Sequence, residues 1–311
     1  MSTSFPPMRH MAPTISVAAP AKVNFGLAIL GRRPDGYHDI LSVFQAVSWA
    51  DHLALDATPS GITVACSQPE GWPPVPAGRD NLVWRAAELV ARHFRRPHGV
   101  AIRLEKRIPA GAGLGGGSSD AAATLRALAA LWEIDAKETE WLDLCARLGS
   151  DVPFFFHALG PGSSGTAIVE GRGERIRMLP PQEPLILVIA VPTTSVSTAW
   201  AYRQVQPPYR DHAAYRARVE ALAAGTMTLR TFCRELENDF EPIVERHVPA
   251  IAELHRGLVE AGAVTALMSG SGSAVFGIFG DRAQAERAVG ELAPDAVRVV
   301  ATSLTEPSPA V

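Results

Sequence analysis

The sequence has few cysteines, few lysines and no long apolar segment. Its three cysteines, Cys66, Cys145 and Cys233, lie far apart and form no CxxC pair, which argues against a disulfide framework and favours a reducing compartment. The longest apolar stretches fall far short of the roughly 20 residues that a membrane-spanning helix needs. No apolar segment typical of a secretion signal follows Arg9 and His10. We therefore expect a soluble, cytoplasmic protein without a membrane span.

Basic residues do not outnumber acidic ones, and very few of the basic residues are lysines. A net charge of −3 at pH 7 and a pI near 6.3 provide no basic field for nucleic acid, so we expect no nucleic-acid partner. The nine histidines form no HxxxH or HExxH pattern, which leaves a histidine-based zinc site without support. Only three of the 29 basic residues are lysines, namely Lys22, Lys106 and Lys137. Each lysine is therefore an exception of interest.

Apolar patterning predicts a mixture of strands and helices. Strands are predicted at 14–18, 23–30, 41–49, 62–66, 100–105, 167–176, 185–191 and 297–301. Helical periodicity is found at 82–94, 120–132, 141–148, 209–223 and 282–292, and in part of 238–259. Mixed strands and helices without strict alternation favour an α+β fold. Prolines at 180, 181 and 184 suggest a boundary, so we predict a disordered tail (1–12), an N-terminal domain (13–180) and a C-terminal domain (181–305).

The most informative segment is rich in glycine. Five of the seven residues from Gly111 to Gly117 are glycines, and they lie between a predicted strand and an alanine-rich helix. Glycines let backbone N–H groups approach an anion closely, and the N-terminus of a helix favours phosphate. Ser118 and Ser119 add hydroxyl groups at the helix start. We predict a phosphate-binding loop, and the alternative is a flexible linker with a helix cap.

Other phosphate-binding motifs fit this segment less well. Gly111, Gly113 and Gly116 match the GxGxxG pattern of dinucleotide-binding folds. However, Pro109 separates the strand from the first glycine, and no strand ending in an acidic residue follows about 20 residues later. No lysine follows the glycines as in a Walker A loop, and the HRD and DFG signatures of protein kinases are missing.

Taken whole, the segment PAGAGLGGGSSDAAA at 109–123 resembles the phosphate loop of the GHMP kinases, a superfamily named for galactokinase, homoserine kinase, mevalonate kinase and phosphomevalonate kinase. The openings PAKVNFGL (20–27) and GRRPDGYH (31–38) resemble one branch. That branch phosphorylates the C2 hydroxyl of 4-diphosphocytidyl-2-C-methyl-D-erythritol in non-mevalonate isoprenoid biosynthesis. Three further motifs follow in the expected order: LGSDVPF (148–154), NDFEP (238–242) and SGSGS (269–273). Two small departures are seen. SGSGS has serines where the family often has threonine, and NDFEP has phenylalanine where cysteine is frequent.

The resemblance implies an ATP-dependent small-molecule kinase. It also implies a two-domain α+β fold with the active site in the cleft between the domains. We expect ATP to arrive with Mg²⁺, which neutralises phosphate charge during transfer; the motifs name no protein ligand for the metal and set no oligomeric state. By resemblance, the residues that bind ATP are Pro109, Ala110, Gly111, Ala112, Gly113, Leu114, Gly115, Gly116, Gly117, Ser118 and Ser119.

Lys22 and Asp151 are the catalytic residues that the resemblance implies. Asp151 follows a predicted helix end and precedes an apolar, strand-like run at 152–156, which would hold its carboxylate at the edge of a core. Lys22 beside it would keep the carboxylate ionised, so Asp151 would orient the hydroxyl and accept its proton late. Asn24 lies on the same strand face and would position the same group. The structural alternatives are a turn aspartate before Pro153 and a solvated lysine.

Aromatic residues would recognise the cytosine of the cytidine diphosphate ester. Tyr37 offers a stacking face, His38 a ring nitrogen or backbone amide, and Tyr202 a second aromatic ring. Base stacking on an aromatic ring contributes roughly 1 to 3 kcal/mol in single-stranded nucleic-acid complexes. By resemblance, the loop that approaches the glycine segment and the substrate phosphates contains Ser269, Gly270, Ser271 and Gly272. Its structural alternative is a simple hairpin turn.

Two other functions stay open at this point. A GHMP-fold protein can bind a nucleotide or metabolite as a sensor, although the presence of both Lys22 and Asp151 counts against this. A GHMP kinase can also act on a different alcohol, and the DGYH motif with Tyr37 is the feature that argues for the cytidine ester.

Overall fold

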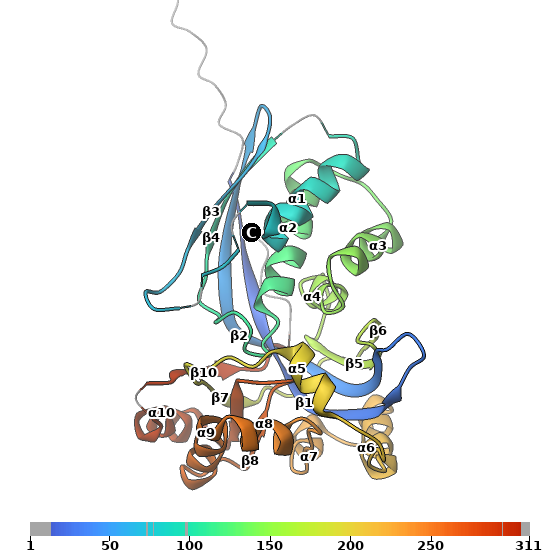
Figure 1. The fold of residues 1–311 in the computed structure, drawn as a ribbon. Helices are drawn as coiled ribbons and strands as arrows, with labels where there is room; N and C mark the ends of the chain where they lie inside the picture. Colours follow the sequence, from blue (N-terminus) through green and yellow to red (C-terminus); the bar gives the residue numbers. More distant parts are fainter. Residues whose placement is uncertain (1–13, 73, 77, 97–98, 294, 306–311) are drawn as a thin grey trace, which may run out of the picture.

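The computed structural model describes residues 14–305 except 73, 77, 97, 98 and 294. The predicted tail at 1–12 lies outside the described residues. The chain is built on two β-sheets with helices packed beside them (Figure 1). In the part of the chain that the structure describes, no helix is both long and apolar enough to cross a membrane.

The larger sheet has six strands in the order β3-β4-β2-β5-β6, with β1 also paired to β2. Only the β3–β4 pair is parallel. Four helices cover one side of this sheet (Figure 1). The strands are β1 Ile15–Arg32, β2 His38–Thr58, β3 Ile62–Ser67, β4 Gly99–Glu105, β5 Thr166–Gly171 and β6 Arg175–Met178, and the helices are α1 Leu82–His93, α2 Gly116–Leu131, α3 Glu138–Leu148 and α4 Val152–Ala158.

The smaller sheet is antiparallel, with four strands in the order β10-β7-β9-β8. Helices α8, α9 and α10 pack against this sheet and share a cluster of buried side chains with it (Figure 1). The strands are β7 Ile186–Val191, β8 Thr265–Met268, β9 Val275–Phe279 and β10 Val297–Thr302. The helices of this half are α5 Thr198–Gln204, α6 Ala213–Ala223, α7 Leu229–Phe232, α8 Glu241–His247, α9 Pro249–Glu260 and α10 Arg282–Glu291.

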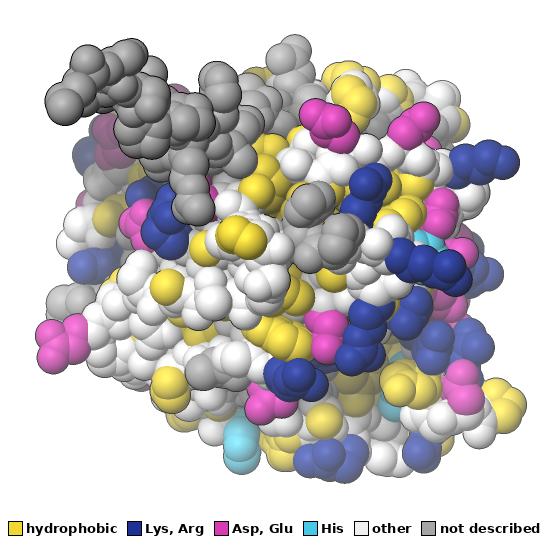
Figure 2. Space-filling model, turned by 90° about the horizontal axis from the view of Figure 1, so that it is seen from above, with side chains coloured by type: hydrophobic (Ala, Val, Ile, Leu, Met, Phe, Trp, Pro, Cys, Tyr) yellow, Lys and Arg dark blue, Asp and Glu magenta, His cyan; other side chains and the backbone are white. Residues whose placement is uncertain are grey.

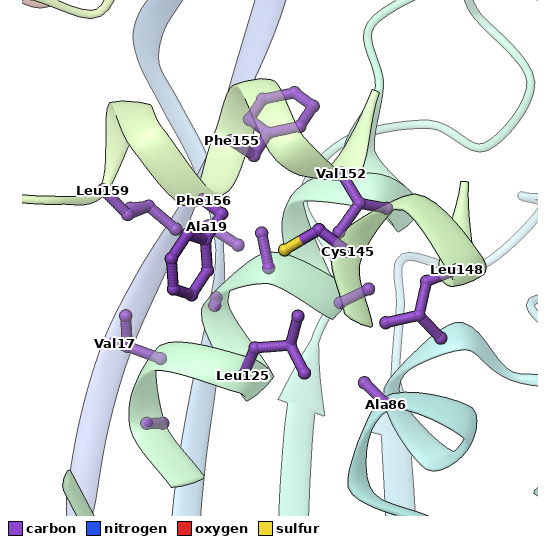
Figure 3. Close-up of a cluster of buried hydrophobic side chains, with 14 of the residues drawn as sticks. Val17, Ala19, Ala86, Leu125, Cys145, Leu148, Val152, Phe155, Phe156 and Leu159 are labelled. Atoms are coloured by element: carbon purple, nitrogen blue, oxygen red, sulfur yellow. The ribbon is translucent and has the colours of Figure 1, made fainter. Parts of the chain in front are cut away.

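Buried apolar side chains form three clusters: one between the larger sheet and its helices, one that joins the two sheets, and one between the smaller sheet and helices α8, α9 and α10. In the first, Leu125 of α2 and Phe156 of α4 lie among side chains from the sheet and helices (Figure 3). In the second, Phe25 of β1 packs against Phe276 of β9 with ring centroids 5.6 Å apart. The two sheets therefore share a core, and residues 179–185 connect β6 of the larger sheet to β7 of the smaller one.

Several predicted elements differ from the structure. The strands predicted at 14–18 and 23–30 form one strand, β1, and the strand predicted at 167–176 forms β5 and β6. The apolar run at 152–156 is the start of helix α4, not a strand. Because every side chain of this run is buried, its sequence has no periodicity that separates a helix from a strand, although Pro153 suits a first helical turn. Helix α2 begins at Gly116 rather than near residue 120, so two glycines and two serines that we assigned to the loop form its first turn.

Acidic and basic side chains are interspersed on the molecular face seen from above (Figure 2). Hydrophobic side chains lie among them, and the basic side chains are most frequent on one side of the view. The described part of this face therefore carries charge of both signs, as the small net charge of the sequence leads one to expect.

Candidate active site

A cavity of about 1500 Å³ lies between residues that belong to the larger sheet and its helices and residues that follow β7 in the chain. Its walls come from β1, the glycine loop, the start of α4, helix α5 and the loop between β8 and β9. A volume of this size exceeds that of common ligand pockets. The cavity brings together most of the residues that the motifs singled out.

The glycine loop and the first turn of α2 form one wall of this cavity. Gly115 is the N-cap residue of α2, with a φ of +71°, and no side chain caps the first turn. Its backbone N–H groups are therefore available to an anion. Leu114 instead lies in the core and Ser119 is fully buried, so neither lines the cavity. The predicted ATP-binding residues that do line it are Pro109, Ala110, Gly111, Ala112, Gly113, Gly115, Gly116, Gly117 and Ser118.

Lys22 of β1 is buried and aims its ammonium at the glycine loop. Its Nζ donates hydrogen bonds to Asn24 Oδ1 at 2.5 Å and to Gly113 O at 2.8 Å. Burial lowers the pKa of Lys22, and the nearby charge of Asp151 opposes this shift. Asn24 is held in turn, because its Nδ2 donates to Ser42 Oγ at 3.0 Å. The prediction that Lys22 and Asn24 share a strand face is confirmed.

Asp151 occupies the N-cap position of α4, but its side chain makes no capping hydrogen bond. The carboxylate is half-buried and lines the cavity, where Ser150 Oγ donates to its Oδ1 at 3.4 Å. Burial raises the pKa of Tyr202 to about 12, and the charge of Asp151 adds to this effect. The carboxylate of Asp151 therefore acts electrostatically on both Lys22 and Tyr202 across the cavity.

Aromatic side chains form another wall. The rings of His38 and Tyr202 are stacked, with centroids 5.2 Å apart, and Tyr209 meets His38 edge-on. His38 Nε2 is buried without a hydrogen-bond partner among the described residues. Burial lowers the pKa of His38, and the charge of Arg32 lowers it further, which favours the neutral ring. Tyr37 lines the same cavity but is 58% exposed.

The loop between β8 and β9, residues 269–273, packs directly on the glycine loop. Ser269 Oγ donates to Gly113 O at 3.1 Å and accepts from Asn24 N at 3.3 Å, and a backbone bond joins Ala274 N to Ala112 O at 3.0 Å. Gly270 and Ser271 line the cavity, whereas Ser269 is buried behind it and Gly272 does not reach it. Residues 269–273 therefore contact the glycine loop as well as connecting two strands.

Several side chains at this site were not predicted. Lys106 is buried below the first turn of α2, where its Nζ donates to Asp120 Oδ2 at 2.7 Å and to Asp51 Oδ2. Burial raises the pKa of Asp120 to about 8, although Lys106 opposes the shift. The rarity of lysine pointed to Lys106, but its partner Asp51 lies 55 residues away and carries no local signal. Other unpredicted residues that line the cavity are Arg172, Thr198 and Tyr209.

Comparison with known proteins is consistent with these features. Residues 81–158 match the GHMP kinases N terminal domain and residues 219–297 match the GHMP kinases C terminal domain. A 4-diphosphocytidyl-2-C-methyl-D-erythritol kinase of Chlorobium phaeobacteroides is 41% identical over 88% of this chain and 92% of the relative. The enzyme of that name from Gloeobacter violaceus is 42% identical over 90% of each chain.

Solved structures agree with this assignment. The crystal structure of a 4-(cytidine 5'-diphospho)-2C-methyl-D-erythritol kinase is 37% identical, with a TM-score of 0.78, and the match covers 93% of this chain and 99% of the other. A mevalonate kinase of L. major shares the fold alone, at 16% identity and a TM-score of 0.67 over 94% of this chain and 97% of the other. The predicted α+β GHMP kinase fold is confirmed. The chain belongs to the 4-diphosphocytidyl-2-C-methyl-D-erythritol kinases of the GHMP kinase family.

Proposed function

We propose that this kinase transfers the γ-phosphoryl group of ATP to the C2 hydroxyl of 4-diphosphocytidyl-2-C-methyl-D-erythritol, giving the 2-phosphate and ADP in non-mevalonate isoprenoid biosynthesis. One observation carries the proposal: Lys22 and Asp151 line the same cavity as the glycine loop and the stacked His38 and Tyr202. The names of the relatives support the choice of substrate. The proposed phosphate-binding loop and the proposed base-binding aromatic residues thus line one cavity together with Lys22 and Asp151.

The phosphates of ATP bind at the glycine loop and the uncapped first turn of α2. Backbone N–H groups and the helix dipole supply the attraction there, and the Lys22 ammonium lies at the loop through its bond to Gly113 O. Mg²⁺ enters as the ATP complex and neutralises phosphate charge.

Asp151 and Lys22 carry the transfer step. The C2 hydroxyl oxygen forms a bond to the γ-phosphorus, the bond from that phosphorus to the bridging oxygen breaks, and the hydroxyl proton passes to the Asp151 carboxylate. The positive charge of Lys22 stabilises the negative charge that develops on the phosphoryl oxygens. Two neutral acceptors, Asn24 Oδ1 and Gly113 O, hold its ammonium in place. Asn24 keeps Lys22 in position through its bond to Ser42. The loose transition state of phosphoryl transfer needs proton acceptance only late.

The aromatic wall selects the cytidine ester. The unpartnered Nε2 of the neutral His38 ring is suited to a hydrogen bond with the base edge. Tyr202 stacks on His38 and fixes its orientation, while exposed Tyr37 supplies the stacking face. In the loop at 269–273, Gly270 and Ser271 face the phosphates.

We retain two further proposals. The domains extend over 13–180 and 181–305, since the two sheets divide the chain near that point. The enzyme works in the cytoplasm, which suits Cys66, Cys145 and Cys233 as free thiols.

The deciding experiment is phosphate transfer from labelled ATP with Mg²⁺ to the cytidine ester, with homoserine and mevalonate as comparison acceptors. We expect label on the cytidine ester alone. Preferential labelling of another acceptor would refute the substrate assignment and keep the kinase class. Binding of ATP without transfer to any acceptor would instead favour a nucleotide sensor.

A further inference from the structure

Phe240 of the NDFEP motif lines the cavity. Asn238 and Glu241 of the same motif bind Met268, the last residue of β8, and Asn238 also binds Gly270 in the loop at 269–273. We propose that Asn238 and Glu241 are positioning residues that hold this loop against Lys22 and the glycine loop. The inference rests on the proposed function, because that function places the loop at the substrate phosphates. Residues 237–241 are called the anchor segment below.

Asn238 fixes two carbonyl groups on either side of Ser269. Its side chain is buried, and its Nδ2 donates hydrogen bonds to Met268 O and Gly270 O, each at 2.8 Å. Its Oδ1 accepts from Phe240 N at 2.9 Å. The amide therefore uses both of its donor hydrogens and its acceptor, and no carboxylate of the same shape can replace the donors.

Glu241 binds the backbone N–H of the same residue, Met268. This glutamate is the first residue of α8, and its Oε1 accepts from Met268 N at 2.7 Å. The N–H of Met268 is thus bound by Glu241 and its carbonyl by Asn238. Since Met268 is the last residue of β8, these two bonds set the direction in which the loop leaves the strand.

The anchor segment also binds β1, the strand that carries Lys22. Leu27 N donates to Glu237 O at 2.8 Å, Asp239 N donates to Leu27 O at 3.0 Å, and Ile29 N donates to Asp239 Oδ2 at 2.7 Å. These bonds border the two irregularities in the pairing of β1 with β2, between Asn24 and Leu27 and between Ile29 and Gly31. One short segment therefore fixes both the catalytic strand and the loop.

His255 of α9 balances the charge behind the loop. Its Nδ1 lies 2.9 Å from Glu245 Oε1 and 3.5 Å from Glu241 Oε1. Burial raises the pKa of Glu241, and the charge of His255 opposes the shift. Glu245 is a matched control, because it pairs with His255 as Glu241 does but, among the described residues, makes no hydrogen bond to Met268 or to the loop at 269–273.

Three variants of the full chain test the proposal by two measurements. Hydrogen exchange of the peptide at 265–275 reports on the loop, and steady-state kinetics with both substrates give kcat and each KM. In Glu241→Ala the loop amides exchange faster and kcat falls roughly 10- to 100-fold, since a displacement of about 1 Å costs up to a hundredfold. In Glu241→Gln the exchange rate of the loop amides and kcat stay near those of the wild type, because the amide oxygen still accepts from Met268 N. Glu245→Ala keeps both near those of the wild type.

A fourth variant, Asn238→Asp, tests the other anchor residue. It keeps the shape and the acceptor but loses both donors, so the same loosening of the loop and loss of kcat are expected. Unchanged exchange of the loop in both Glu241→Ala and Asn238→Asp would overturn the inference. A loosened loop with unchanged kcat and KM would instead refute the proposed role of the loop at the phosphates, and with it the catalytic consequence of the anchor. A loss of kcat in Glu241→Ala that Glu241→Gln does not restore would exclude the hydrogen bond to Met268 as its cause.

Discussion

Replacing Gly113 by alanine tests the contact between the glycine loop and the loop at 269–273. A Cβ at this position would lie 2.3 Å from Ser269 O, whereas ordinary contacts begin at 3.4 Å. The two loops would have to separate by roughly 1 Å, and a displacement of this size costs up to about a hundredfold in rate. We therefore expect kcat/KM to fall roughly 30- to 100-fold in Gly113→Ala.

The same substitution also strains the backbone, so the two effects must be separated. Gly113 has a φ of +78°, and a left-handed conformation costs a residue with a Cβ about 1 to 2 kcal/mol, or roughly 2 to 8 °C in Tm. Gly162 has a φ of +72° and open space around its Cβ position. The control Gly162→Ala should therefore show a similar fall in Tm with full activity.

The assay couples ADP release to a spectroscopic signal and is run beside a thermal melt. A folded Gly113→Ala protein with kcat/KM within about twofold of the wild type would refute the reasoning, because the loops would then tolerate separation. An equal loss of activity in Gly162→Ala would show that backbone strain, and not the contact with Ser269, is responsible.

Three further predictions follow from the site. Asp151→Asn should keep ATP affinity but lose roughly a hundred- to ten-thousandfold in kcat, the range for removal of a general base; undiminished turnover would remove Asp151 from the mechanism. Because burial lowers the pKa of His38, its ring stays neutral below the ordinary value of 6.5, so KM for the cytidine ester should stay flat as pH falls to 6.5 and rise only at lower pH. His38→Asn should abolish that rise, and a rise already complete above pH 7 would contradict the assignment. Because the pKa of Asp120 is raised to about 8, folding favours its protonated form; its contribution to the free energy of unfolding is largest below about pH 4 and is lost as pH rises through 8. We would measure the free energy of unfolding in urea for the wild type and Asp120→Asn between pH 5 and 9. The wild type should lose stability relative to the variant as pH rises through 8, and parallel plots of this free energy against pH would refute the prediction.

Local patterns predicted the parts of the site that lie close together in the sequence. The glycine run was identified because glycine between a strand and a helix has a specific use for phosphate. Lys22 and Asn24 were placed on one face because strand side chains alternate, and the 2.5 Å bond between them agrees. Family resemblance supplied Asp151, which no local pattern separates from an ordinary turn residue.

Contacts between distant segments could not be read from the sequence. Nothing near Asp51 indicates that it meets Lys106 and Asp120, since their pairing is set by how β2, β4 and α2 pack. The burial of Leu114 depends on backbone turns in the glycine loop that the sequence leaves open. Ser119 lies in the first turn of α2, and its burial depends on how that helix packs. Helix α4 was taken for a strand because burial on all sides removes the periodicity.

The core shared by the two sheets constrains how ligands enter and leave. Separating the halves would expose Phe25, Phe276 and their buried neighbours to water, at a cost of roughly 25 cal/mol for each Å² of apolar surface. Hinged opening of the whole molecule is therefore opposed, and exchange of substrates and products falls to the rim of the cavity.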